Sequence, residues 1–330
     1  MKISCLVCKS KFNTLVAEQK DIRFNQNEVF KIFKCYECDL LFTVDRLNED
    51  SIKKYYPKSY SAYKFDMKTN IFLESKTSKL KTYIWINFAN LKFLALTTPN
   101  LLYKIFYKLL VILLNLIGKE SFNYKIPPKN RHSESNMLYL GSGNPDKMFY
   151  YKYILGFDIT VLDINQEVIE YYNRNNIAAI NKTIKNASFK IKEFDLIIGS
   201  HVLEHLFTPL DEIINLKSWL KDDGLLILSF PNYSSLEWKR KPIYFDVPRH
   251  RSHFSKKAAE NLFEIANLKT KFKTCIPYGY GFAQSKALKR FNNGEKILNF
   301  NKLTKVQKTI SLFLTFFGNS GNIQYYLVKK

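Results

Sequence analysis

The sequence predicts an α/β domain with a mostly parallel sheet over residues 131–330, preceded by a small metal-stabilised module. After Pro127-Pro128-Lys129-Asn130, short apolar runs alternate with amphipathic stretches, the pattern of βαβ units. A glycine pair follows the first of these runs, as in nucleotide-binding α/β folds. Two Cys-x-x-Cys pairs near the start of the chain predict the metal site.

The cysteine pairs, Cys5/Cys8 and Cys35/Cys38, define a zinc ribbon over residues 1–50. Each pair can bring two thiolates to one side of a tight turn, and four thiolates satisfy tetrahedral zinc. A segment this short buries too little core to fold alone, so zinc binding would supply the missing folding free energy. A catalytic zinc is disfavoured because four protein ligands leave no open position. The alternative is four buried, unligated cysteines, which would not need two matched pairs.

Residues 51–130 form a linker with an apolar helical segment at 79–118. The run from Leu101 to Ile117 fits a helix packed on the α/β domain or lying on a membrane surface. A membrane span is the least favoured interpretation, because Lys104 and Lys108 interrupt the run and the uncharged remainder is only about half of what a bilayer requires.

Charge and cysteine usage limit the partners and the compartment. The chain carries 51 Lys and Arg against 29 Asp and Glu, and the net charge of +22 would attract the phosphates of nucleic acid, of nucleotide-linked substrates or of an anionic membrane face. A compositional bias toward lysine would explain the excess equally well. No secretory signal precedes Cys5, so we expect a cytoplasmic protein, with peripheral contact to the inner membrane face as an alternative.

The α/β domain contains six candidate strands and four candidate helical stretches. The strands are Met137–Leu140, Ile159–Leu162, Phe194–Gly199, Leu225–Phe230, Lys271–Pro277 and Ile323–Val328. The helices are Tyr150–Leu155, Glu167–Asn173, Leu210–Leu220 and an insertion at Lys302–Phe317.

Two features of the first strands indicate a nucleotide-type ligand. Gly141, Ser142 and Gly143 follow the first strand, where glycines let the backbone approach a ligand. Twenty residues beyond Gly143, the second strand ends in Asp163, where such folds place a carboxylate that accepts both ribose hydroxyls. The alternative for Asp163 is an ordinary cap of the following helix.

Later segments carry a family resemblance. "FDLIIGS" running into "HVLEHL", then "LKDDGLLILSFPN" and "DVPRHRSHFS", resemble class I S-adenosylmethionine-dependent methyltransferases, especially the group similar to ubiquinone-biosynthesis O-methyltransferases. The resemblance covers approximately residues 135–330. Together with the cysteine pairs and the "KYYPKSYSAY" linker, the chain is similar to methyltransferases found among surface-polysaccharide and sugar-modifying enzymes.

The resemblance implies a Rossmann-like, seven-stranded sheet with a reversed final strand. It assigns Gly141 and Gly143 to the methionine moiety of S-adenosylmethionine, Asp163 to the ribose, and Ser200 and His201 to the floor beneath the sulfonium. The chain departs from the family at two positions. Tyr139 stands where relatives carry an acidic residue, and Pro145 where they carry a third glycine. Both departures would lower cofactor affinity, or leave a catalytically silent relative.

Histidines after the fourth and fifth strands are candidates for a general base, because a hydroxyl acceptor is a poor nucleophile until it loses its proton. His205 and His250 are the catalytic candidates, with His253 as a third. A weaker alternative is that Glu204 and His205 help to hold a divalent ion. The H-x-x-E-H pattern of zinc peptidases also occurs here, but it begins at a strand terminus rather than within a helix, so we reject a peptidase.

The predicted function is methyl transfer from S-adenosylmethionine to a small-molecule or glycan acceptor: a sugar hydroxyl in surface-polysaccharide biosynthesis, on a nucleotide- or lipid-linked substrate. The first alternative is an RNA methyltransferase, suggested by the charge and the ribbon. Against RNA, Ser200-His201-Val202-Leu203 stands where base-amine methylases carry an N-P-P-Y-like segment. The second alternative is a silent methyltransferase-like module in a glycan assembly complex.

Overall fold

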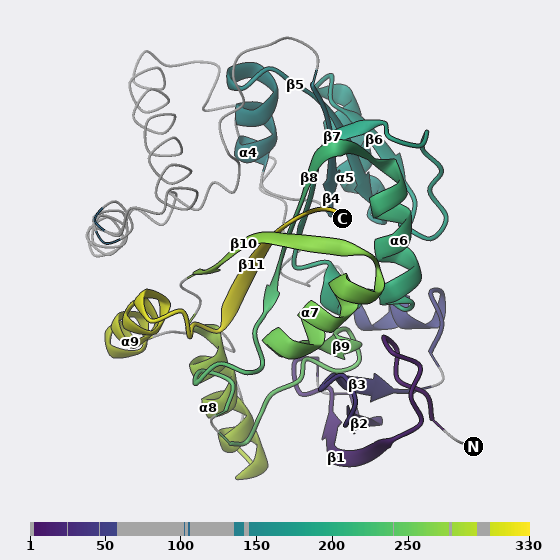
Figure 1. Ribbon diagram of the computed structural model, residues 1–330. Coiled ribbons are helices and arrows are strands. Elements are labelled where there is room, and N and C mark those ends of the chain that lie inside the picture. Colours follow the sequence, from purple (N-terminus) through teal and green to yellow (C-terminus); the bar gives the residue numbers. More distant parts are fainter. Residues whose placement is uncertain are drawn as a thin grey trace. The chain divides into compact units, whose positions relative to one another are not determined.

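The computed structural model describes residues 3–24, 26–45, 47–57, 102, 105, 135–141, 145–239, 241–276, 279–295 and 304–330 (Figure 1). All but two residues of the apolar segment at 79–118 lie outside this set, so the expectation for that segment is not tested. Within the described ranges, no helix is long and apolar enough to cross a membrane.

A seven-stranded sheet forms the centre of the α/β fold and confirms the predicted class. Its strand order is β10-β11-β8-β7-β4-β5-β6. β4 pairs with β5 and β5 with β6 in parallel, whereas β10 and β11 are antiparallel. The strands are β4 (Ser135–Leu140), β5 (Phe157–Asp163), β6 (Ala178–Asn181), β7 (Phe194–Ser200), β8 (Leu220–Pro231), β10 (Leu268–Ile276) and β11 (Asn322–Lys329).

The helices of the α/β fold lie between these strands in the sequence, as βαβ units require. They are α4 (Pro145–Phe149), continued by a π-helical turn at Tyr150–Ile154, α5 (Gln166–Arg174), α6 (Pro209–Trp219), α7 (Lys256–Ile265), α8 (Tyr280–Asn292) and α9 (Lys305–Phe316). α5 shows how the sequence specifies them: the Asn165 side chain accepts a hydrogen bond from the Glu167 amide, and Val168, Ile169 and Tyr172 form its buried face.

The N-terminal residues form a second, four-stranded sheet in the order β1-β2-β3-β9. β1 (Asn13–Lys20), β2 (Val29–Cys35) and β3 (Leu41–Val44) form an antiparallel meander, followed by a 3-10 helix at Ser51–Tyr55. The fourth strand, β9 (Ser252–His253), comes from the segment after β8 and pairs antiparallel with β3.

The chain divides into two compact units. The first comprises residues 1–61, 199–218 and 228–330, and the second comprises residues 62–198 and 219–227. Within the first unit, the N-terminal sheet does not have a separate core. Phe30 and Ile32 of β2 belong to one buried cluster with Trp238, Tyr244 and Phe245.

Candidate active site and metal centre

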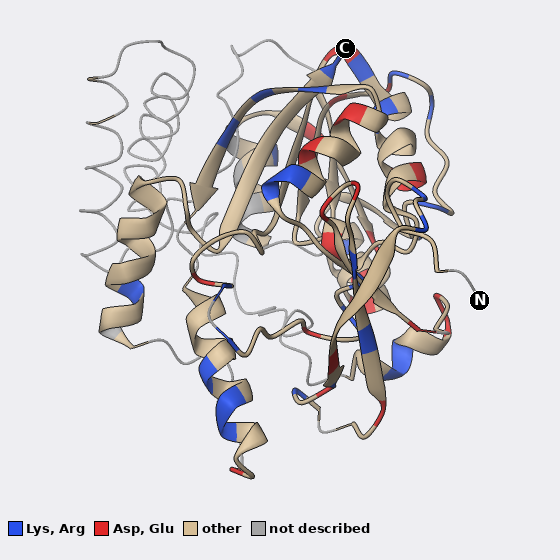
Figure 2. Cartoon of the chain, turned by 60° about the horizontal axis from the view of Figure 1, so that its bottom comes forward, with Lys and Arg blue, Asp and Glu red and all other residues tan. Residues whose placement is uncertain are grey.

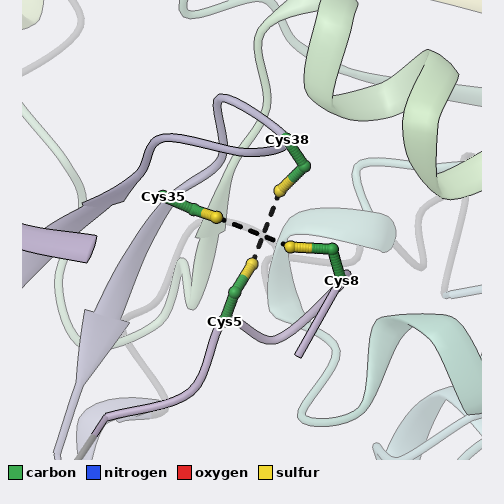
Figure 3. Close-up of side chains that lie close together, drawn as sticks. All are labelled: Cys5, Cys8, Cys35 and Cys38. Atoms are coloured by element: carbon green, nitrogen blue, oxygen red, sulfur yellow. Dashed lines mark hydrogen bonds between the residues drawn. The ribbon is translucent and has the colours of Figure 1, made fainter. Parts of the chain in front are cut away.

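The four N-terminal cysteines converge on a common point (Figure 3). The Sγ atoms of Cys5 and Cys38 are 3.5 Å apart, and those of Cys8 and Cys35 are also 3.5 Å apart. All four sulfur atoms lie within 4.8 Å of one another. This is the sulfur set that a tetrahedral zinc ion requires, with no position left for a water molecule or a substrate.

The two cysteine pairs are held by the same backbone turn. The carbonyl of Cys5 accepts a hydrogen bond from the Lys9 amide at 3.2 Å, and the carbonyl of Cys35 accepts one from the Asp39 amide at 3.1 Å. Lys9 and Asp39 both adopt the left-handed backbone conformation, with φ of 59° and 63°. The same turn therefore brings the two thiols of each pair together, as the matched Cys-x-x-Cys spacing predicts.

In the first unit, β7 ends in Ser200 and the chain turns sharply at His201, whose φ is 55°. The His201 amide donates to the Ser229 carbonyl at 2.8 Å. The His201 side chain is held at both nitrogens: Nδ1 lies 2.9 Å from Glu204 Oε1, and Nε2 lies 3.0 Å from Asn322 Nδ2. An amide donor at Nε2 puts the ring proton on Nδ1, which donates it to Glu204.

His205 and His250 lie side by side in the first unit. Their ring centroids are 4.8 Å apart and the rings are nearly perpendicular. His205 Nδ1 lies 2.9 Å from the Arg249 carbonyl, to which only a protonated Nδ1 can donate. The neutral His205 ring therefore keeps a lone pair on Nε2.

His250 is more deeply buried than His205, and burial lowers its pKa to about 3. Its Nε2 is 3.7 Å from Asp246 Oδ2, and its Nδ1 is buried without a hydrogen-bond partner. His253, the third candidate, is fully buried and its Nε2 lies 3.1 Å from the Thr43 hydroxyl. Its ring packs against Tyr233 and Phe245, so its surroundings are those of a core residue.

Glu204 completes the cluster. It is 1% exposed, and burial alone would disfavour its charge, but the hydrogen bond from His201 lowers its pKa to about 2. Glu204 is thus a buried carboxylate. One ligand atom each of Glu204, His205 and His250 lies within 4.8 Å of the others.

A buried ion network supports these histidines. The Arg249 side chain is completely buried and makes two 2.7 Å hydrogen bonds to Asp21 and one of 2.7 Å to Asp246. It also donates to the Tyr55 carbonyl at 3.1 Å. Because the Arg249 carbonyl accepts the His205 proton, the N-terminal residues that hold Arg249 also fix the position of His205. Sequence reasoning missed Asp21, which lies in a loop with no motif.

The second unit contains the first two strand ends. Gly141 follows β4 with φ of 85°, and its amide donates to the Leu162 carbonyl at 2.9 Å. This left-handed conformation favours glycine. Ser142 and Gly143 lie outside the described residues, so their assignment is not tested.

Asp163 ends β5 and is 8% exposed. Its Oδ1 accepts a hydrogen bond from the Asn165 amide at 2.7 Å, and burial raises its pKa to about 6. The cap of α5 is Asn165 rather than Asp163, so the helix cap offers no alternative explanation for this carboxylate.

Comparison with known proteins agrees with this arrangement. Residues 127–271 match the model of a methyltransferase domain. The chain carries a class I S-adenosylmethionine-dependent methyltransferase domain. No curated protein matches the sequence significantly.

Several solved structures are similar to this chain at low sequence identity. A candidate sarcosine dimethylglycine methyltransferase from Galdieria sulphuraria is 17% identical, with a TM-score of 0.44 over 60% of this chain and 80% of its own. An S-adenosylmethionine-dependent methyltransferase from Mesorhizobium loti is 10% identical, with a TM-score of 0.42; the match covers 60% of this chain and 93% of that protein. A third, from Aquifex aeolicus, is 12% identical, with a TM-score of 0.38; the match covers 60% of this chain and 84% of that protein.

The two departures from the methyltransferase pattern have local explanations. Tyr139 is 3% exposed, and burial raises its pKa to about 12. Its ring lies 6.3 Å from that of Tyr151, so an aromatic contact takes the place of the usual acidic residue. Pro145 is the first residue of α4, a position where a helix needs no amide donor for its own hydrogen bonds.

Replacing Asp163 with alanine should weaken binding of S-adenosylmethionine by roughly 10- to 100-fold. A charge-assisted hydrogen bond is worth about 1.5–3 kcal/mol, and about 1.4 kcal/mol corresponds to a factor of ten. Isothermal titration calorimetry would measure the change. Asp158→Ala, at an exposed position of the same strand, is the matched control. An unchanged dissociation constant for Asp163→Ala would refute the ribose assignment.

Proposed function

We propose that the methyltransferase acts on a hydroxyl oxygen of a small-molecule or glycan acceptor, a sugar hydroxyl in surface-polysaccharide biosynthesis. The observation that carries this proposal is the His205 ring, which keeps an unprotonated Nε2 beside His250 and Glu204. An amine or carbanion acceptor would not need a base of this kind, whereas a hydroxyl does. The resemblance to sugar-modifying methyltransferases supports the glycan class.

The chemistry follows from the state of the two imidazoles. S-adenosylmethionine supplies the methyl group as an electrophile activated by its sulfonium charge. His205 Nε2 would accept the proton that the acceptor hydroxyl loses when it is methylated. His250 is the weaker candidate base, because a pKa of about 3 makes its ring a poor proton acceptor at neutral pH.

A phosphate on the acceptor suits the charge of the chain. The excess of lysine and arginine favours a nucleotide- or lipid-linked substrate over a neutral free sugar. α8 carries several basic residues (Figure 2), of which Lys286, Lys289 and Arg290 are exposed. The proposed setting is cytoplasmic, with contact to an anionic membrane face where the substrate is lipid-linked.

Transfer of label from radiolabelled S-adenosylmethionine to nucleotide-linked and lipid-linked sugars tests this function directly. Structured RNA in a parallel assay tests the main alternative. Label in RNA, or tight salt-dependent RNA binding, would replace the glycan proposal. An absence of S-adenosylmethionine binding in calorimetry would instead favour the silent module.

We infer that Cys5, Cys8, Cys35 and Cys38 hold one structural zinc ion, on the basis of their four converging sulfur atoms. Protein purified without chelator should therefore contain one equivalent of zinc by mass spectrometry of the metal. Cys8→Ser should lower the zinc content, whereas Cys275→Ser, in β10, should not. Less than about half an equivalent in the unmodified protein would contradict the ribbon assignment.

A further inference from the structure

We propose that α9 docks on an anionic lipid bilayer and inserts one apolar face between the lipid headgroups. The proposal deepens the proposed function, because it names the surface that would bring a lipid-linked acceptor to the enzyme. It rests on that function only for the identity of the acceptor, since binding of the helix to lipid requires no methyl transfer.

A stripe of large, exposed apolar side chains runs along α9. The helix covers Lys305–Phe316, and the stripe continues into the residue that caps its carboxyl end. Its members are Val306, Ile310, Phe313 and Phe317, which are 67%, 42%, 62% and 63% exposed. Successive members are three or four positions apart, so they share one face of the helix. The ring centroids of Phe313 and Phe317 are 4.7 Å apart, so the aromatic side chains form one continuous surface.

The opposite face of α9 is attached to the body of the first unit. The Ser311 hydroxyl donates to Oε1 of the buried Glu237 at 2.8 Å, and Leu312 is buried beside it in the sequence. The helix begins with a capping box, in which Thr304 and Gln307 each accept a hydrogen bond from the other's amide. A helix that already has a buried face and a capped start does not need a second apolar face for its own folding. An exposed apolar surface of this kind marks an interaction site.

The charge around the stripe identifies a membrane as the occupant. From residue 296 to residue 330 the sequence contains six lysines and no Asp or Glu, and Lys305 and Lys308 belong to α9 itself. In Figure 2, α9 accordingly carries no acidic segment, and the neighbouring α8 adds exposed basic side chains. Attraction to lipid phosphates acts over a Debye length of about 8–10 Å, so these lysines need not point at the membrane to contribute. Exposed phenylalanines on a basic helix are typical of helices that lie in the headgroup region.

The length of α9 fits a helix that lies on the bilayer. Its 12 residues extend about 18 Å at 1.5 Å per residue, whereas the hydrocarbon core is about 30 Å thick. The face attached to Glu237 through Ser311 stays with the protein, so the stripe alone enters the lipid.

The stripe is connected closely to the candidate active site. Residues 318–321 join Phe317 to Asn322, the first residue of β11. The side-chain amide of Asn322 lies 3.0 Å from His201 Nε2. A bilayer that holds Phe317 would therefore lie only a few residues of chain away from the end of β7, where a lipid-linked acceptor has to arrive.

Vesicles of equal parts phosphatidylcholine and phosphatidylglycerol test the proposal with the full-length protein, and co-sedimentation measures the partition coefficient. The unmodified protein should bind these vesicles at least about tenfold more tightly than vesicles of phosphatidylcholine alone. The double variant Phe313→Gln/Phe317→Gln should bind the mixed vesicles at least about tenfold more weakly than the unmodified protein. Phe12→Gln/Ile191→Gln is the matched control, because it removes two apolar side chains that are 63% and 77% exposed elsewhere in the chain. The control should bind as the unmodified protein does.

Absence of binding of the unmodified protein to the mixed vesicles would overturn the proposal, and this result requires no variant to fold. Equal partition coefficients for the two double variants would also overturn it, because the lipid contact would then lie elsewhere. A dimer in light scattering that Phe313→Gln/Phe317→Gln converts to a monomer would assign the stripe to a second copy of the chain instead.

Lipid binding and methyl transfer can fail independently. Lipid binding that Phe313→Gln/Phe317→Gln loses supports the docking surface even if no sugar accepts a methyl group, a result that would refute the proposed function alone. Where transfer is observed, this variant should lose activity on a lipid-linked acceptor in vesicles and keep activity on a nucleotide-linked acceptor in solution. Equal activity of the variant and the unmodified protein on the vesicle-bound acceptor would contradict the proposed docking.

Discussion

Replacement of Asp21 by alanine should lower the free energy of unfolding by about 3–5 kcal/mol, because it removes one of the two carboxylates that pair with the buried guanidinium of Arg249. Asp246 and the Tyr55 carbonyl would remain in contact with Arg249. Neither replaces the two 2.7 Å hydrogen bonds that Asp21 accepts. Urea unfolding followed by tryptophan fluorescence would measure the loss, since Trp238 lies in the core shared with the N-terminal sheet.

Asp50→Ala is the matched control for Asp21→Ala. Asp50 is also an ion-paired N-terminal aspartate, but its side chain is 87% exposed. Its removal should change the free energy of unfolding by no more than about 0.5 kcal/mol. A loss below about 1 kcal/mol for Asp21→Ala would show that Arg249 remains solvated or paired in the variant, and the network would then not be the support described here.

Replacement of His205 by alanine should lower turnover by about a hundredfold or more, because general-base assistance is commonly worth 10²–10⁴ in rate. Binding of S-adenosylmethionine should remain nearly unchanged. A purely positional role would give a smaller loss.

The corresponding His250→Ala variant separates the two histidines. Because burial lowers the His250 pKa to about 3, its loss should leave the pH dependence near neutrality intact. If both variants kept near-normal turnover on the identified acceptor, histidine catalysis at these positions would be wrong, and methyl transfer would depend on proximity alone.

The sequence predicted the regular parts of the α/β fold well. The strands around Met137, Ile159, Phe194 and Leu225 were found because buried parallel strands are continuous apolar runs with turn residues at their ends. β6 was missed because it is only four residues long and lies partly at the surface. α7 and α8 were also missed, and the insertion at Lys302–Phe317 corresponds to α9 alone.

The candidate site was predictable where residue types carried the chemistry. The cysteines and the pair of His205 and His250 could be named in advance, because thiolates and imidazoles after strand ends are recognisable from spacing. The pairing of Asp21 with Arg249 could not, because it depends on a contact between two irregular segments far apart in the chain. A loop carboxylate has no local pattern that distinguishes a surface position from a buried one.

The pairing of β3 with β9 also bears on the order in which the N-terminal sheet can form during synthesis. The four cysteines are synthesised before residues 249–253, so the proposed zinc ion would have its complete ligand set before β9 exists. Leu41 and Phe42 cannot pair until His253 and Ser252 have been synthesised, and only then does the sheet gain its fourth strand. The ion pair between Asp21 and Arg249 likewise cannot form until Arg249 has been synthesised. The N-terminal sheet would therefore begin as a three-stranded meander with an open edge, and residues 252–253 close that edge later in translation.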